Sequence, residues 1–267
     1  MKPVLKYPGA KWNLAQWIIS FFPAHTTYLE PFFGSGAVFF NKLPSQKEVI
    51  NDLDDNAVNL FRMIREKPEE LAALIEATPW ARTEYLDSYS KTGDNLEDAR
   101  RFLVRCWQAF AGRLGHRSGW CHSGAKGMPH MNRWRRLPKQ ILLASERLLM
   151  AEIENRPAVR LIQEYCYPNV LIYADPPYVW ETRSDRQSGR KMYFQEMTDA
   201  DHIELLDALD AHPGPVILSG YACDLYDNRL NHWRRETRKA QAEKGQTRTE
   251  VLWINPVAAK EIQGRLF

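Results

Sequence analysis

Residues 171–178, Leu-Ile-Tyr-Ala-Asp-Pro-Pro-Tyr, are the segment that most restricts how this chain folds. The apolar run precedes a double proline, which predicts a buried parallel strand that ends in a rigid loop. Asp175 then lies at the carboxyl end of the strand, the edge at which open α/β sheets bind ligands. Because proline has no N–H donor, the Asp175 side chain and the Pro176 carbonyl present only hydrogen-bond acceptors there.

Such a set of acceptors suits an exocyclic amino group. Tyr178 adds a flat face on which a planar base can stack, a contact worth about 1–3 kcal/mol. An ordinary strand followed by a proline turn explains the tetrapeptide equally well, because Asp-Pro-Pro also occurs in plain loops. The segment therefore indicates a site for a base only in combination with other features.

A glycine turn follows an earlier predicted strand. Residues 27–31 are expected to form the strand, residues 32–36 (Phe-Phe-Gly-Ser-Gly) the turn, and residues 37–42 a helix. Glycines at this place let the polar part of a cofactor approach the backbone amides of a helix N-terminus. The third glycine of the dinucleotide fingerprint is absent, which argues against a nicotinamide or flavin site.

An acidic residue follows the next predicted strand, residues 48–52. Asp52 ends this strand about twenty residues beyond the glycine turn, where a carboxylate accepts hydrogen bonds from the two ribose hydroxyls of an adenosine. Asp54 and Asp55 compete for this role, but they are better suited to cap the helix expected at residues 56–65.

Between residues 68 and 167 the sequence predicts helices and no strand. The helices are expected at residues 69–77, 82–90, 95–111 and 137–150, with a glycine-rich basic loop between the last two. Residues 100–139 contain no acid, and their basic side chains are Arg100, Arg101, Arg105, Arg113, Arg117, Lys126, Arg133, Arg135, Arg136 and Lys139. Such a segment suits contacts with phosphates and base edges, although a solvated basic surface is the alternative.

The net charge of the chain is only +3, which is too small to predict binding to nucleic acid. That prediction therefore depends on the basic segment at residues 100–139. The four cysteines are scattered, and the spacing of His116, Cys121, His122 and His130 matches no standard zinc site, so we expect no metal. The apolar run at residues 17–22 is too short to span a membrane and lacks the cleavage pattern of a signal peptide. We therefore expect a cytoplasmic protein.

The remaining segments complete an α/β pattern. Residues 181–191 are polar and predict a mobile lid or a DNA-contacting loop. A helix is expected from an N-cap at Thr198 to residue 211, then a strand at residues 215–219 and a hairpin formed by residues 233–238 and 249–254. Since every motif lies at the carboxyl end of a strand, all of them should face one crevice.

This arrangement resembles the D12 class of N6-adenine-specific DNA methyltransferases, which are related to the Dam enzymes, with the motif order of the α group. The motifs that carry the resemblance are Tyr-Pro-Gly-Ala-Lys at residues 7–11, Glu-Pro-Phe-Phe-Gly-Ser-Gly at 30–36, Asn-Asp at 51–52 and Asp-Pro-Pro-Tyr at 175–178. The family often has tryptophan where this chain has Tyr7. The chain also lacks the Phe-Asn-Val-Pro-Phe-Gly type of string found in Dam, so the resemblance does not extend to a GATC target.

The resemblance implies a Rossmann-like α/β fold, with a seven-stranded S-adenosylmethionine-dependent methyltransferase sheet and an inserted helical DNA-recognition domain. Residues 1–67 would form the cofactor-binding part, 68–167 the insertion and 168–267 the catalytic part. The implied cofactor-binding residues are Tyr7, Lys11, Glu30, Phe32, Gly34, Gly36, Asp52 and Asp175. The implied catalytic residues are Asp175, Pro176, Pro177 and Tyr178, and the candidate DNA-binding residues are Arg113, Arg117, Asn132, Arg133 and Arg135.

We therefore predict an enzyme that flips an adenine out of double-stranded DNA and methylates its N6 atom. We expect a monomer that binds DNA and no membrane, with a companion restriction enzyme as a further possible partner. The alternatives are methylation of N4 of cytosine, of adenine in RNA or of a glutamine side chain. A catalytically silent DNA-binding protein with this fold is the alternative from another class.

Overall fold

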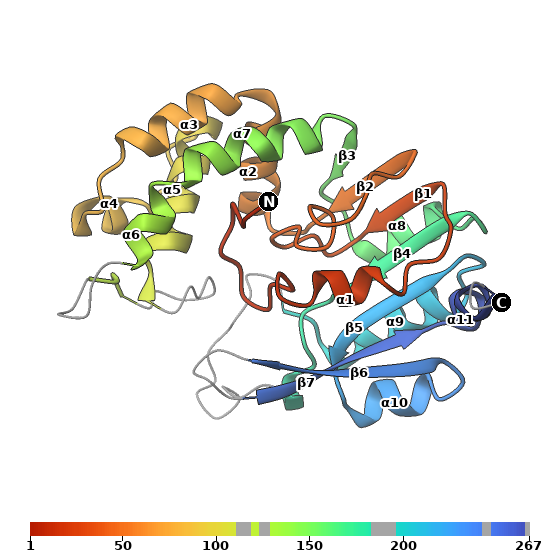
Figure 1. Ribbon diagram of the computed structural model, residues 1–267. Coiled ribbons are helices and arrows are strands. Elements are labelled where there is room, and N and C mark those ends of the chain that lie inside the picture. The colour runs from red at the N-terminus through yellow and green to blue at the C-terminus, as the bar shows by residue number, and fades with distance from the viewer. Residues whose placement is uncertain (111–118, 123–128, 183–195, 242–246, 265–267) are drawn as a thin grey trace.

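The computed structural model describes residues 1–110, 119–122, 129–182, 196–241 and 247–264. Within these residues seven strands form one sheet, in the order β3-β2-β1-β4-β5-β7-β6 (Figure 1). The strands are β1 (Thr27–Glu30), β2 (Lys47–Asn51), β3 (Ala151–Glu154), β4 (Val170–Ala174), β5 (Val216–Tyr221), β6 (Arg234–Gln241) and β7 (Thr247–Ile254). Strands β1 to β5 pair with one another in parallel, whereas β7 pairs antiparallel with both β5 and β6.

The sheet separates two hydrophobic cores because successive residues of a strand point to opposite faces. One core joins α1 (Ala15–Ile19) and α11 (Pro256–Gly264) to Tyr28, Leu171, Ile217 and Leu252. The other joins α8 (Ala158–Glu164), α9 (Asp199–Asp210) and α10 (Asp224–Arg229) to Leu29, Ile172, Leu218 and Val251. The sheet is therefore covered on both faces, as a parallel sheet requires.

A group of helices lies between β2 and β3 in the chain. Its members are α2 (Asp55–Glu66), α3 (Pro68–Ala77), α4 (Arg82–Asp87), α5 (Asn95–Gln108), α6 (Pro129–Trp134) and α7 (Leu137–Leu148). Helix α2 packs on α5 and α7, and α3 packs on α7. Figure 1 shows α3 to α7 gathered on the side of the sheet where β2 and β3 lie. No helix in the described part of the chain is long and apolar enough to span a membrane.

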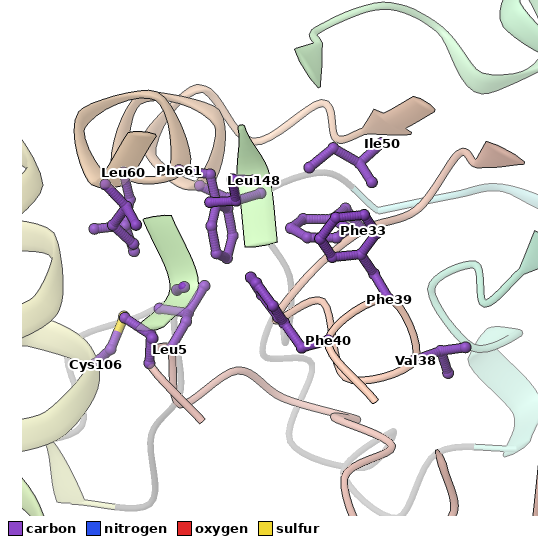
Figure 2. Close-up of a cluster of buried hydrophobic side chains, with 14 of the residues drawn as sticks. Leu5, Phe33, Val38, Phe39, Phe40, Ile50, Leu60, Phe61, Cys106 and Leu148 are labelled. Atoms are coloured by element: carbon purple, nitrogen blue, oxygen red, sulfur yellow. The ribbon is translucent and has the colours of Figure 1, made fainter. Parts of the chain in front are cut away.

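An aromatic cluster ties these helices to the glycine turn (Figure 2). The ring centroid of Phe33 lies 4.8 Å from that of Phe61 on α2, and the rings of Phe39 and Phe40 are 5.1 Å apart. The helix predicted for residues 37–42 is wrong, because these residues form turns. The Asn41 side chain donates to the Ala37 carbonyl at 2.7 Å, the acceptor that its own N–H would use in an α-helix.

Strand β3 was missed, since no strand was predicted between residues 68 and 167. Its four residues pair in parallel with β2 at the edge of the sheet. The helix predicted to start at Thr198 is confirmed as α9, with a capping box in which the Thr198 hydroxyl accepts from the Asp201 N–H. The predicted hairpin is also confirmed, although β6 and β7 extend farther toward its tip than expected.

Candidate active site

The loops that follow β1, β2 and β4 line a cavity of about 380 Å³. These three parallel strands are neighbours in the sheet, so their carboxyl ends meet at one edge. Of the predicted cofactor-binding and catalytic residues, those that line the cavity are Tyr7, Lys11, Glu30, Phe32, Gly34, Asp52, Asp175, Pro176, Pro177 and Tyr178. The structure thus brings together residues that are up to 171 positions apart in the chain.

The two glycines of the turn have different surroundings. Gly34 has a φ of +51°, and a Cβ placed there would lie 3.3 Å from Cδ1 of Tyr7, so the tyrosine ring packs directly on the glycine backbone. Gly36 does not line the cavity. A Cβ at Gly36 would lie 2.5 Å from Cζ of Phe33 and 2.7 Å from Cε2 of Phe40, so this glycine is required by packing.

Asp52 is held by the glycine turn. Its Oδ2 accepts a hydrogen bond of 2.7 Å from the Gly34 N–H, and its Oδ1 accepts one of 2.9 Å from the Asp54 N–H. Burial raises the pKa of Asp52 to about 6, despite these backbone hydrogen bonds. Because a carboxylate has about four lone-pair positions, Asp52 retains acceptors for ribose hydroxyls. The Asp54 side chain accepts from the Asn56 N–H and caps α2, as predicted.

Lys11 joins the N-terminal segment to the loop after β4. Its Nζ lies 2.8 Å from Oδ1 and 3.0 Å from Oδ2 of Asp175, and 2.6 Å from the Tyr178 hydroxyl. The carboxylate of Glu250 on β7 lies 3.3 Å away. Burial disfavours the charge on Lys11, but Asp175 and Glu250 outweigh burial and raise its pKa well above the usual value.

Asp175 lies directly after β4 and is only partly exposed. In addition to the two contacts from Lys11, its Oδ1 accepts a hydrogen bond of 2.9 Å from the Ser219 hydroxyl at β5. The Ser219 oxygen also lies 2.9 Å from the Tyr173 hydroxyl. The carboxylate is therefore fixed in position by Lys11 and by Ser219, which Tyr173 in turn contacts.

Two further carboxyl groups lie near Lys11 and Asp175. Burial raises the pKa of Glu30 to about 8, against a hydrogen bond of 2.7 Å from the Tyr28 hydroxyl. Burial also raises the pKa of Glu250 to about 7, although Lys11 opposes this shift. Acidic groups therefore gather around Asp175, and Lys11 is a cation shared by Asp175 and Glu250.

The ring of Tyr178 is nearly buried and stacks on Tyr221, with the ring centroids 4.3 Å apart and the planes 26° apart. The guanidinium of Arg248 lies over the ring of Tyr221, 4.9 Å from the ring centroid. Tyr178 lines the cavity and Tyr221 does not. Tyr221 therefore supports one side of the tyrosine that the sequence predicted as a stacking platform.

Sequence analysis did not identify Ser219, Tyr221 or Glu250 as site residues. A signal was present for Glu250, because it lies two residues before Leu252 and therefore on the same, buried face of β7. A buried acid beside apolar residues on a strand face is unusual. Ser219 and Tyr221 gave no comparable signal, since their contacts depend on the order of the strands in the sheet.

The candidate DNA-binding residues that the structure describes do not line the cavity. Asn132 and Arg133 are exposed on α6, and Arg135 is exposed just beyond it. Arg113 and Arg117 lie outside the described residues, as does most of the predicted lid at residues 181–191. Helix α6 is anchored by the buried Trp134, which donates to the Thr78 carbonyl at 3.2 Å.

The cavity suits S-adenosylmethionine. Its volume lies within the usual range for small-molecule sites. It is lined by the Asp52 carboxylate, which can accept the ribose hydroxyls, and by the glycine turn, which lets the cofactor approach the backbone closely. Acidic side chains at the other end suit the positively charged sulfonium and amino groups. The strand order and the cavity together define the class of fold, that of the Rossmann-like, S-adenosylmethionine-dependent methyltransferases.

The family follows from the sequence comparison. The family described as D12 class N6 adenine-specific DNA methyltransferase matches residues 7–244, and the chain belongs to it. The match includes every motif from Tyr7 to Tyr178.

Relatives include a protein named type II methyltransferase M1.LlaDCHI from Lactococcus lactis subsp. cremoris, 34% identical over 101 residues, which are 37% of this chain and 35% of the relative. A DNA adenine methylase of Vibrio cholerae is 26% identical over 132 residues, 46% of this chain and 44% of the relative. The matched segments thus span less than half of both relatives. A solved SAM-dependent methyltransferase from Agrobacterium tumefaciens is a distant structural neighbour, with a TM-score of 0.37 and 9% identity over 91% of this chain and 59% of that one.

Proposed function

We propose that this protein transfers a methyl group from S-adenosylmethionine to N6 of adenine at a specific sequence in double-stranded DNA. The observation that carries the proposal is the position of Asp175, at the end of β4, inside the cavity and fixed by Lys11 and Ser219. Membership of the D12 class supports adenine as the target. The cofactor supplies a methyl group on a positively charged sulfur.

The residues of this chain position the cofactor. The carboxylate of Asp52 accepts the ribose hydroxyls, and the ring of Tyr7 packs beside the glycine turn. Phe32 and Gly34 border the same part of the cavity. Asp175 places negative charge near the cationic groups of the cofactor, which attracts them to one end of the site, and the Glu30 carboxyl lines the same cavity.

The base is held by acceptors and by stacking. The Asp175 carboxylate and the Pro176 carbonyl accept the two hydrogens of the amino group, which concentrates the nitrogen lone pair toward the incoming methyl group. The negative charge of Asp175 also opposes the positive charge that develops on N6. Such catalysis depends on position and electrostatics.

The base stacks on the face of Tyr178 opposite Tyr221, because Tyr221 already covers one side of the ring. The removal of a base from the DNA stack costs a few kcal/mol, which contacts with the pocket and with phosphates offset. We propose that the segment from α3 to α7 supplies contacts to DNA, with Asn132, Arg133 and Arg135 among them. The protein acts as a monomer in this proposal, and a companion restriction enzyme is a further proposed partner.

The test is the identity of the methylated nucleoside. Purified protein is incubated with genomic duplex DNA and the cofactor, and the DNA is then digested and analysed by mass spectrometry. N6-methyladenine is the expected product, and the Asp175→Ala variant should give none while it still binds the cofactor. N4-methylcytosine, or methylation of RNA or protein alone, would overturn the proposal, as would near-normal turnover by the variant.

A further inference from the structure

The ammonium group of Lys11 has more acceptors within reach than it has protons. It carries three hydrogens. Besides Asp175 and the Tyr178 hydroxyl, its Nζ lies 3.1 Å from the Gly9 carbonyl. The Oε1 atom of Glu250 lies 3.3 Å from the same nitrogen but accepts no hydrogen bond from the described residues. Glu250 is therefore a second carboxylate beside Lys11 that the present hydrogen bonds leave unused.

Glu250 has no role in the chemistry described above. Its side chain is 3% exposed, it does not line the cavity, and it lies opposite Tyr221 in the pairing of β5 with β7. A buried carboxylate oxygen without a hydrogen bond is costly, and burial raises the pKa of Glu250 to about 7. Its place beside the same ammonium that contacts Asp175 links Glu250 to the reacting group.

Asp175 is already in contact with Lys11 and Ser219 before a base is bound. Lys11 contacts both oxygens of Asp175, and Ser219 contacts one of them. Three of the roughly four lone-pair positions of Asp175 are therefore occupied, and an amino hydrogen competes with the ammonium for this carboxylate. An ammonium beside the reacting nitrogen also repels the positive charge that develops there. Lys11 is buried, so it needs another anion when it leaves Asp175.

We propose that Glu250 is a positioning residue that accepts the ammonium group of Lys11 as its ion-pair partner when Asp175 accepts the amino group of the target base. The inference rests on the proposed function and adds a step to it. Because Lys11 passes between two carboxylates that it already contacts, the buried ammonium keeps an anionic partner throughout. Glu250 acts through Lys11 and touches neither the base nor the cofactor.

A first test needs neither DNA nor turnover. The Asp175→Asn substitution removes the competing charge at nearly constant shape, so a crystal structure of this variant should show Lys11 turned toward Glu250. The distance from Nζ to Oε1 should shorten from 3.3 Å to about 2.8 Å, as in a charge-assisted hydrogen bond. A Lys11 side chain that stays on residue 175 or leaves both groups would overturn the proposal.

A second test is kinetic. In Glu250→Gln the ammonium has no second anion, so kcat should fall about tenfold or more, while KM for DNA and the affinity for S-adenosylmethionine stay unchanged. Glu250→Asp should restore part of kcat, because it restores the charge. Glu236→Gln, the same substitution on β6 outside the cavity, is the matched control and should keep the wild-type kcat.

The proposal is contradicted if Glu250→Gln keeps the wild-type kcat, or if kcat falls only together with cofactor affinity and the folded fraction. The two tests also separate this inference from the proposed function. If the wild-type protein methylates no adenine, the proposed function fails, and the structure of Asp175→Asn still decides whether Glu250 accepts Lys11.

Discussion

The substitution Lys11→Met should destabilise the protein more strongly at high pH than at low pH. Lys11 lies 2.8 Å from Asp175 and 3.3 Å from Glu250. At an effective dielectric constant of about 20, these distances give gross attractions of about 6 and about 5 kcal/mol. Part of this energy offsets desolvation, so the net loss expected from removing the buried ammonium is about 3–5 kcal/mol.

The pH dependence follows from the carboxyl groups that are left behind. Without Lys11 the pKa of Glu250, already about 7, rises further above its value in the unfolded chain. A carboxyl group whose pKa is raised in the folded state does not lower the free energy of unfolding at a pH where it is protonated in both states. The full loss of stability appears above the pKa of the folded state. The difference in unfolding free energy between wild type and variant should therefore be larger at about pH 8 than at about pH 5, and the increase should come above about pH 7, where Glu250 ionises in the folded wild type.

Urea-induced unfolding, followed by tryptophan fluorescence at these two pH values, measures this difference. The double variant Lys11→Met/Glu250→Gln is the control, and it should recover part of the stability at high pH because one buried charge is gone. An equal loss at both pH values, or no loss at either, would refute the idea that Lys11 neutralises this acidic cluster.

Three further predictions concern other parts of the site. Burial raises the pKa of Glu30 to about 8, so the stability of the wild type should fall as the pH rises from about 5 to about 8. In Glu30→Gln the melting temperature should depend less on pH over that range, and an unchanged pH dependence would contradict this. Asp52→Asn should weaken S-adenosylmethionine binding about tenfold by calorimetry without unfolding the protein, and wild-type affinity would exclude a ribose contact. Gly36→Ala should cost about 1–3 kcal/mol of unfolding free energy, because its Cβ would overlap Phe33, whereas Gly93→Ala, which also has a positive φ but open space, should cost less.

The order of elements was largely predictable because its signals are local. The apolar residues of β4, the acid after β2 and the cap at Thr198 each depend on neighbouring residues. Strand β3 was missed because its sequence, Ala-Glu-Ile-Glu, is short and half charged. It forms a strand because it pairs with β2, and that pairing is a tertiary contact.

The sequence predicted only those site residues that belong to a recognisable motif. Asp175, Asp52 and Lys11 belong to motifs, and the cavity brings them together. The contacts of Ser219 and Tyr221 require β5 to lie beside β4, which no local pattern specifies. The crowding of carboxyl groups around Lys11 depends on the pairing of β7 with β5 in the same way.

The central claim is site-specific methylation of adenine in DNA, and one measurement tests it most directly. The protein is expressed in a host that lacks its own adenine methylation, and the host DNA is sequenced by a method that reports N6-methyladenine in context, with Asp175→Ala as the control. We expect methyladenine in one short motif with the wild-type protein and none with the variant. Host DNA without methyladenine, from cells in which the wild-type protein is folded and binds the cofactor, would contradict it.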